Sequence, residues 1–336
     1  MAATRSDGPR VAESIDELIA GATDRVAVHP DDGKSGSDFE LLTIDGDAMF
    51  LKVVSYDRDW IMRCSGNTDH WEYKAWCAGL YHQVPAEIDT AMVAMALDTT
   101  ETTPQLAMLM HNISDGLIPA GDAPVPVAQH EQLIDHMAAF HAAFWGWADT
   151  VGLSPIESRF GFFSDANIAR EMASDDPPVP IRVARDGWAA LPDRSPKLNE
   201  RVQAVRANPK ALGDELRATP LTFVAGDWKM GNLGSHRDGR TIVLDWAYPG
   251  ASAGCLDLSW YLAINSARIP ISKEDTIAVY REGLERRGVE TGGWFENQMQ
   301  KSLLGAMAML GWEKALGGDD ELAWWEEAVT RSASDA

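Results

Sequence analysis

Short apolar runs bounded by turn residues follow one another through the first 115 residues. Runs of this length and spacing are typical of β-strands. Asp45-Gly46, between two of the runs, favours a tight hairpin turn. A helix is expected between the two pairs of runs, over residues 68–81, with Thr68 as its N-cap. The predicted strands are residues 39–44, 48–54, 91–97 and 105–110.

Helical periodicity replaces the strand pattern after residue 115. One predicted helix carries Leu133, Met137, Phe140 and Phe144 on a single face. The proline-rich stretch 175–180 is expected to be a loop. Further helices are predicted over residues 199–206, 256–267, 273–287, 294–316 and 321–331. The pattern therefore predicts an α+β, bilobal chain, with a small β-rich lobe over residues 1–112 and a larger, mainly helical lobe over residues 113–336.

One β-rich insert, residues 221–245, interrupts the helical half. A short apolar strand, residues 221–224, leads into a polar stretch in which Asn232 follows Asp227 by five positions. Two further strands, 233–235 and 241–244, are expected to form a hairpin around Asp238-Gly239. Because the second of these strands ends at Asp245, the hairpin would bring that carboxylate beside Asp227 and Asn232.

These residue types suit phosphoryl transfer from ATP, which needs positioning and neutralisation of charge. The Asp227 carboxylate could orient the hydroxyl group of an acceptor. Asn232 and Asp245 offer the oxygen ligands that Mg²⁺ prefers. Taken singly, each of the three is more typical of a turn or a helix cap than of a catalytic site. It is their placement between predicted strands that favours a catalytic site.

The first lobe supplies matching candidates for the nucleotide. Lys52 lies within an apolar strand, where burial of its charge would require a partner, and Glu72 on the next helix could provide it. Gly33, Ser35 and Gly36 belong to a flexible turn whose backbone N–H groups could contact phosphates. A P-loop is excluded there, because its pattern would need glycine at position 28, which is valine.

Taken together, these residues resemble the aminoglycoside phosphotransferase and choline kinase-like family, over roughly residues 30–290. The resemblance implies a protein-kinase-like fold that uses ATP and Mg²⁺. It implies that Lys52 contacts the ATP phosphates and that Glu72 orients Lys52. It further implies that Asp227 is the catalytic base and that Asn232 and Asp245 bind Mg²⁺.

The same resemblance extends to residues outside this core set. It implies that Asp257 supports the catalytic loop from a helix, and that the backbone near Met110 and Asn112 binds adenine. Ala225 stands where the family usually has histidine. Lys229 stands where a second histidine is common; protein kinases of the Ser/Thr type carry lysine there, so we expect Lys229 to neutralise the transferred phosphate.

Charge and cysteine content limit the partners of the protein. The 336 residues include 29 Lys and Arg against 51 Asp and Glu, a net charge of −22. This balance disfavours a broad nucleic-acid surface or docking on anionic lipid. It allows a cationic acceptor, although solubility alone is the more general reason for an acidic surface. Cys64, Cys77 and Cys255 form no metal-binding or disulfide pattern, and no signal or membrane span is recognisable, so a cytoplasmic protein is expected.

The sequence thus predicts an ATP- and Mg²⁺-dependent phosphotransferase acting on a hydroxyl of a small molecule. An aminoglycoside-like antibiotic, an amino alcohol and a sugar are equally open as acceptors. The alternative is a pseudokinase that binds nucleotide without catalysis and regulates a partner.

Overall fold

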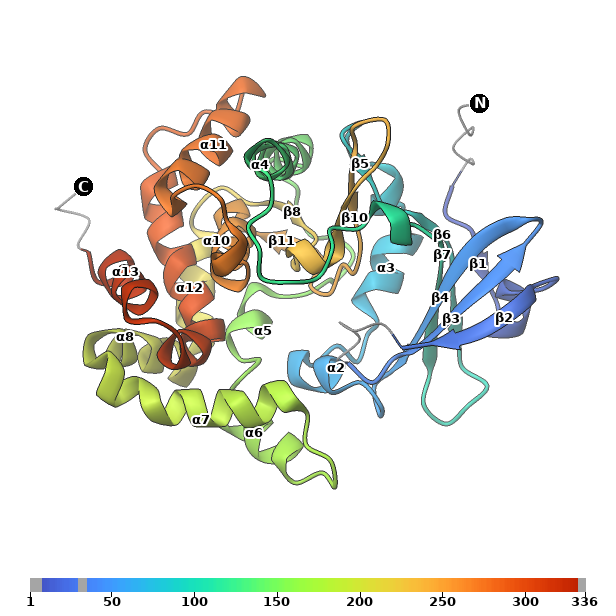
Figure 1. The fold of residues 1–336 in the computed structure, drawn as a ribbon, viewed down its shortest axis with the longest axis horizontal. Coiled ribbons are helices and arrows are strands. Elements are labelled where there is room, and N and C mark those ends of the chain that lie inside the picture. The colour runs from blue at the N-terminus through green and yellow to red at the C-terminus, as the bar shows by residue number, and fades with distance from the viewer. Residues whose placement is uncertain (1–7, 30–34, 332–336) are drawn as a thin grey trace.

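The computed structural model describes residues 8–29 and 35–331. Strands gather in one lobe, at the right of Figure 1, and helices build most of the other. The strands of the small lobe are β1 Val11–Ala12, β2 Thr23–Val28, β3 Asp38–Ile44, β4 Asp47–Ser55, β6 Met92–Asp98 and β7 Gln105–His111. They form a six-stranded sheet in the order β1-β6-β7-β4-β3-β2. The predicted α+β, bilobal organisation is therefore confirmed.

The four predicted strands correspond to β3, β4, β6 and β7. Asp45 and Gly46 join β3 to β4 with φ angles of 53° and 88°. Two positive φ angles in succession are what the tight hairpin turn requires, and Asp-Gly tolerates them. The sequence pattern did not predict β2, because it is an edge strand whose side chains are mostly exposed and which therefore lacks an apolar face.

The helix expected over residues 68–81 is shorter and starts later than predicted. Thr68 is not its N-cap: the helix begins at Trp71, after His70 with φ 50°. The Asn67 side chain accepts the hydrogen bond from the Trp71 N–H, at 3.0 Å, which is the capping interaction that was expected of Thr68. The helices of the small lobe are α1 Ile15–Leu18, α2 Trp60–Ser65, α3 Trp71–Cys77 and the 3₁₀ turn η1 Leu80–His82.

The large lobe packs around α12 Phe295–Leu316, whose side chains from Leu303 to Leu310 are all buried. A helix that is apolar on every side belongs at the centre of a helical layer. Around it lie α4 Val127–Ala143, α5 Ile156–Phe160, α6 Asp165–Met172, α7 Val179–Arg194, α8 Pro196–Ala207, α9 Pro209–Arg217, α10 Gly254–Ile264, α11 Lys273–Arg286 and α13 Asp319–Thr330. In the part of the chain that the structure describes, no helix is both long and apolar enough to cross a bilayer.

The predicted helices of this lobe correspond to α4, α8 and α10 to α13. The loop expected over residues 175–180 is two residues too long, because α7 already begins at Val179. Proline is tolerated in the first turn of a helix, where its missing N–H is not needed, so Pro180 does not prevent this start.

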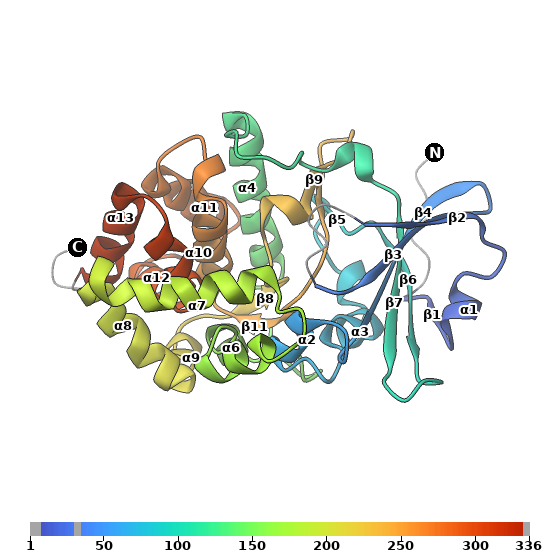
Figure 2. The ribbon, with the colours of Figure 1, turned by 60° about the horizontal axis from the view of Figure 1, so that its bottom comes forward.

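A small three-stranded sheet ties the two lobes together. Its strands are β5 Ile88–Asp89, β9 Leu233–Ser235 and β10 Thr241–Val243, in the order β5-β10-β9. β5 follows the helices of the small lobe, pairs in parallel with β10, and lies beside the hairpin in both ribbon views (Figures 1 and 2). An ion pair of 2.6 Å between Arg240 and Asp89 strengthens this junction. The division of the chain at residue 112 stays a prediction.

Candidate active site

The loop after β8 Thr222–Val224 turns sharply at Gly226, where φ is 83°. A Cβ atom at this position would lie 2.4 Å from the carbonyl oxygen of Tyr248, so only glycine fits. Tyr248 precedes β11 Gly250–Ser252, the antiparallel partner of β8. Ala225, at the position of the family histidine, is buried, and its carbonyl oxygen accepts the N–H of Tyr248 at 3.3 Å. Backbone contacts therefore hold this loop without the histidine.

Asp257 on α10 supports the same loop. Its Oδ2 accepts the Gly226 N–H at 3.2 Å, and its Oδ1 pairs with the Arg159 guanidinium of α5 at 2.8 Å. Burial alone would raise the pKa of Asp257, but contacts with His141 and Arg159 outweigh it and hold the pKa below its ordinary value. The contact with the loop that we expected of Asp257 is present.

The carboxylate of Asp227, which is 8% exposed, receives three side-chain hydrogen bonds. Lys229 donates to Oδ2 at 2.7 Å and the Asn232 amide donates to the same oxygen at 2.8 Å. The indole N–H of Trp260 donates to Oδ1 at 2.8 Å. Asp227, Lys229 and Asn232 were candidates from the sequence, whereas the bond from Trp260 was not foreseen, because it joins residues 33 positions apart.

Asp245 reaches the same place from the end of β10, with φ 54°. Its Oδ1 lies 2.5 Å from the Nζ of Lys52 on β4, so one ion pair spans the two lobes. Burial would lower the pKa of Lys52, but Asp245 outweighs it and the pKa is raised. Burial would likewise raise the pKa of Asp245, but Lys52 and Lys229 lower it. Both groups are therefore charged at neutral pH.

The predicted ion pair between Lys52 and Glu72 is not formed. Glu72 lies close enough for the charge of Lys52 to lower its pKa, yet its Oε2 accepts a hydrogen bond from Asn67, at 2.9 Å. Burial is the larger effect and raises the pKa of Glu72 to about 7. Lys52 pairs instead with Asp245.

A further carboxylate near Lys52 was missed. Asp59 caps the N-terminus of α2 by accepting the N–H groups of Ile61 and Met62. Burial raises its pKa, against the charge of Lys52 and these two hydrogen bonds. The signal in the sequence was an aspartate directly before the apolar run that starts α2.

Asp59 also contacts the turn expected to bind phosphates. Its Oδ2 accepts from the hydroxyl of Ser37 at 3.3 Å, and that hydroxyl lies 2.6 Å from the hydroxyl of Ser35. Gly36 has φ 89°, and a Cβ there would lie 2.5 Å from the carbonyl oxygen of Arg58. Gly33 lies outside the described residues. A phosphate contact by Ser35 and Gly36 stays a prediction.

The segment expected to bind adenine has its backbone donors engaged in the sheet. Met110 lies inside β7, and the N–H of Asn112 donates to the carbonyl oxygen of Ala48 at 2.9 Å. The N–H of His111, between them, donates to Ala91 at 2.9 Å. The N–H groups of residues 111 and 112 therefore already have partners, and adenine recognition by Met110 and Asn112 stays a prediction.

The donor set fits a magnesium ion shared with phosphates. The amide nitrogen of Asn232 is used by Asp227, which leaves its amide oxygen for a cation. Asp245 adds a carboxylate of which one oxygen holds Lys52. In residues 8–29 and 35–331, no group of three or more His, Cys, Asp or Glu could hold a metal alone. Two oxygen ligands from the protein, completed by phosphate and water, are typical of Mg²⁺ in nucleotide enzymes.

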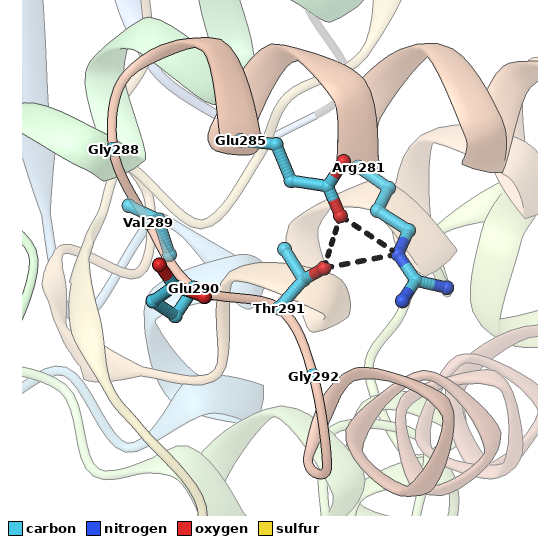
Figure 3. A pocket seen from close by; sticks show the side chains of 7 residues that line it. All are labelled: Arg281, Glu285, Gly288, Val289, Glu290, Thr291 and Gly292. Atoms are coloured by element: carbon cyan, nitrogen blue, oxygen red, sulfur yellow. Dashed lines mark hydrogen bonds and ion pairs between the residues drawn. The ribbon is translucent and has the colours of Figure 1, made fainter.

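A hollow of about 350 Å³ lies outside this site, between the end of α11 and the segment that leads to α12 (Figure 3). Arg281 donates there to Glu285 and Thr291, at 3.2 and 3.0 Å. The hydroxyl of Thr291 also donates to Glu285. These polar groups satisfy one another, so the hollow offers little to a ligand.

Comparisons with known proteins agree with the fold. No protein-family model matches the chain, and no curated protein matches it. Among solved structures, the choline kinase LicA of Streptococcus pneumoniae is similar over 94% of this chain and 96% of its own, with 9% identity and a TM-score of 0.51. A microcompartment-associated aminopropanol kinase is similar over 91% of this chain and 90% of its own, with 11% identity and a TM-score of 0.51.

A thermostable mutant of the aminoglycoside phosphotransferase APH(4)-Ia is similar over 92% of this chain and 93% of its own, with 12% identity and a TM-score of 0.47. At such identities the likeness concerns the fold. The chain has the protein-kinase-like, bilobal fold of small-molecule kinases, as the sequence predicted.

Proposed function

We propose that this protein transfers the γ-phosphoryl group of Mg·ATP to a hydroxyl group of a small molecule. The proposal rests on one arrangement. Lys52 of the small lobe pairs with Asp245 of the large lobe at 2.5 Å, and Asp227 is held by Lys229 and Asn232 at 2.7 and 2.8 Å. The two groups lie close enough for the charge of Lys229 to lower the pKa of Asp245. The fold likeness to a choline kinase and an aminopropanol kinase supports it.

Each residue has a distinct task in this mechanism. Asp227 accepts the proton of the acceptor hydroxyl. Lys229, 2.7 Å from Asp227, neutralises charge on the phosphoryl group in flight. Lys52 holds the α- and β-phosphates, with Glu72 close behind it. Asn232 and Asp245 would hold Mg²⁺, which when bound neutralises the charge of the phosphates.

The acceptor is proposed to be an aminoglycoside-like antibiotic, an amino alcohol or a sugar. A net charge of −22 would attract a cationic acceptor from solution. We also propose that the lobes divide at residue 112 and that the protein is cytoplasmic, since all three cysteines are free thiols.

A screen of phosphate transfer from labelled ATP to aminoglycosides, amino alcohols and sugars tests the proposal. With any acceptor found, Asp227→Ala should lose at least about 100-fold in kcat while its circular dichroism stays unchanged. Asp186→Ala, at an exposed position on α7, is the matched control and should keep full activity. Undiminished transfer by Asp227→Ala would sink the mechanism. Stabilisation by Mg·ATP without transfer to any compound would instead favour the pseudokinase.

A further inference from the structure

We propose that Trp260 is a positioning residue, and that it makes Oδ1 of Asp227 the atom that takes the acceptor proton. The inference rests on the proposed function. It starts from the hydrogen bond of 2.8 Å between the indole N–H and that oxygen.

The hydrogen bonds of the carboxylate identify the free acceptor position. A carboxylate has about four lone-pair sites, two on each oxygen. On Asp227, Lys229 and Asn232 both donate to Oδ2, so the two sites of that oxygen are occupied. Trp260 occupies one site of Oδ1. The remaining site of Oδ1 is therefore the one open to the hydroxyl of an acceptor.

The position of Trp260 makes it a rigid support. Asp257 and Trp260 lie three residues apart on α10, so both project from one face of this helix. Asp257 holds the backbone N–H of Gly226, and Trp260 holds the side chain of the next residue, Asp227. A single helix thereby fixes both the turn of the loop and the rotation of its carboxylate.

The chemistry of the indole suits this task. Its N–H can only donate, and it neither titrates nor carries charge. It therefore orients Oδ1 without competing for the proton. In the reaction the hydroxyl proton moves to Oδ1, the hydroxyl oxygen bonds to the γ-phosphorus, and the bond from that phosphorus to the β-γ bridging oxygen breaks. ADP leaves with the electron pair of the broken bond.

The test compares Trp260→Phe with the wild type in Mg·ATP turnover, with water as acceptor and with any acceptor from the screen. Hydrogen bonds to charged groups are strong enough that kcat should fall about 10- to 100-fold. KM for ATP should stay within about twofold, since Trp260 holds a group that acts on the acceptor. Trp188→Phe on α7 is the control, because in the described chain its indole N–H has no hydrogen-bond partner to lose.

A second measurement needs no turnover. In protein labelled with ¹⁵N-tryptophan, the indole resonance that disappears in Trp260→Phe should shift strongly in Asp227→Asn. An unmoved resonance would overturn the inference, and so would a wild-type kcat in Trp260→Phe. If Trp260→Phe kept the wild-type kcat while Asp227→Ala was inactive, the inference on Trp260 would fail and the proposed function would still stand. Undiminished transfer by Asp227→Ala would refute both the proposed function and the role of Trp260.

Discussion

Replacement of Asp257 by alanine should destabilise the protein more than any surface change. Its side chain is 0% exposed and that of Arg159 is 2% exposed, with 2.8 Å between their charged atoms. Loss of the carboxylate leaves a buried guanidinium without its partner, which typically costs about 3–5 kcal/mol. The N–H of Gly226 loses its acceptor as well. Since whole domains are stable by about 5–15 kcal/mol, this is a large fraction of the total.

The measurement is urea unfolding at pH 7, followed by circular dichroism and tryptophan fluorescence. Asp186→Ala is the matched control, because it also breaks an aspartate–arginine pair of 2.8 Å, but at side chains 61% and 54% exposed. Such surface pairs contribute about 0–1 kcal/mol. If Asp257→Ala lost less than about 1 kcal/mol, the role given to this buried pair would be refuted.

Two further substitutions probe the turn and the buried glutamate. Gly226→Ala should lower the free energy of unfolding more than Gly239→Ala does. Both glycines have a positive φ, which costs alanine about 1–2 kcal/mol, but only at Gly226 would the new Cβ also clash with Tyr248. Equal losses in the two variants would contradict this close contact. Burial raises the pKa of Glu72 to about 7, above the ordinary value near 4.3 that it has in the unfolded chain. Between these two pH values the folded protein binds more protons than the unfolded chain, so the free energy of unfolding falls as the pH rises from about 4.3 to about 7. Glu72→Gln should remove this fall, on the order of 2–3 kcal/mol, in urea titrations at pH 4.5 and 8; equal pH slopes would argue against a raised pKa.

Local signals predicted the parts of this fold that depend on neighbouring residues. Asp45-Gly46 marked the hairpin because its two positive φ angles are a property of the turn itself. The apolar runs of β4 and β7 were recognisable because both strands are buried in the sheet. β2 was missed for the opposite reason, since its exposed side chains follow no apolar pattern.

The partners within the site could not be predicted in the same way. The sequence identified Lys52, but its partner Asp245 lies 193 residues away, and the Glu72 carboxylate accepts from Asn67 instead. The bond of Trp260 to Asp227 was not predictable, because it depends on how α10 packs against the loop. Residue types therefore indicated the chemistry, whereas burial and packing decided which groups touch.

The charge of the site gives Mg²⁺ a second task under the proposed function. Lys52 and Lys229 are both held by carboxylates, Asp245 and Asp227, and Asp59 lies close enough to raise the pKa of Lys52. With Glu72 largely protonated at acidic pH, two lysines face three carboxylates, so the site is not an anion-binding pocket on its own. A nucleotide with several negative charges would meet this excess within a protein of net charge −22. Asn232 and Asp245 would hold the divalent cation, whose charge would reverse the local balance, so that Lys52 could leave Asp245 and contact the nucleotide.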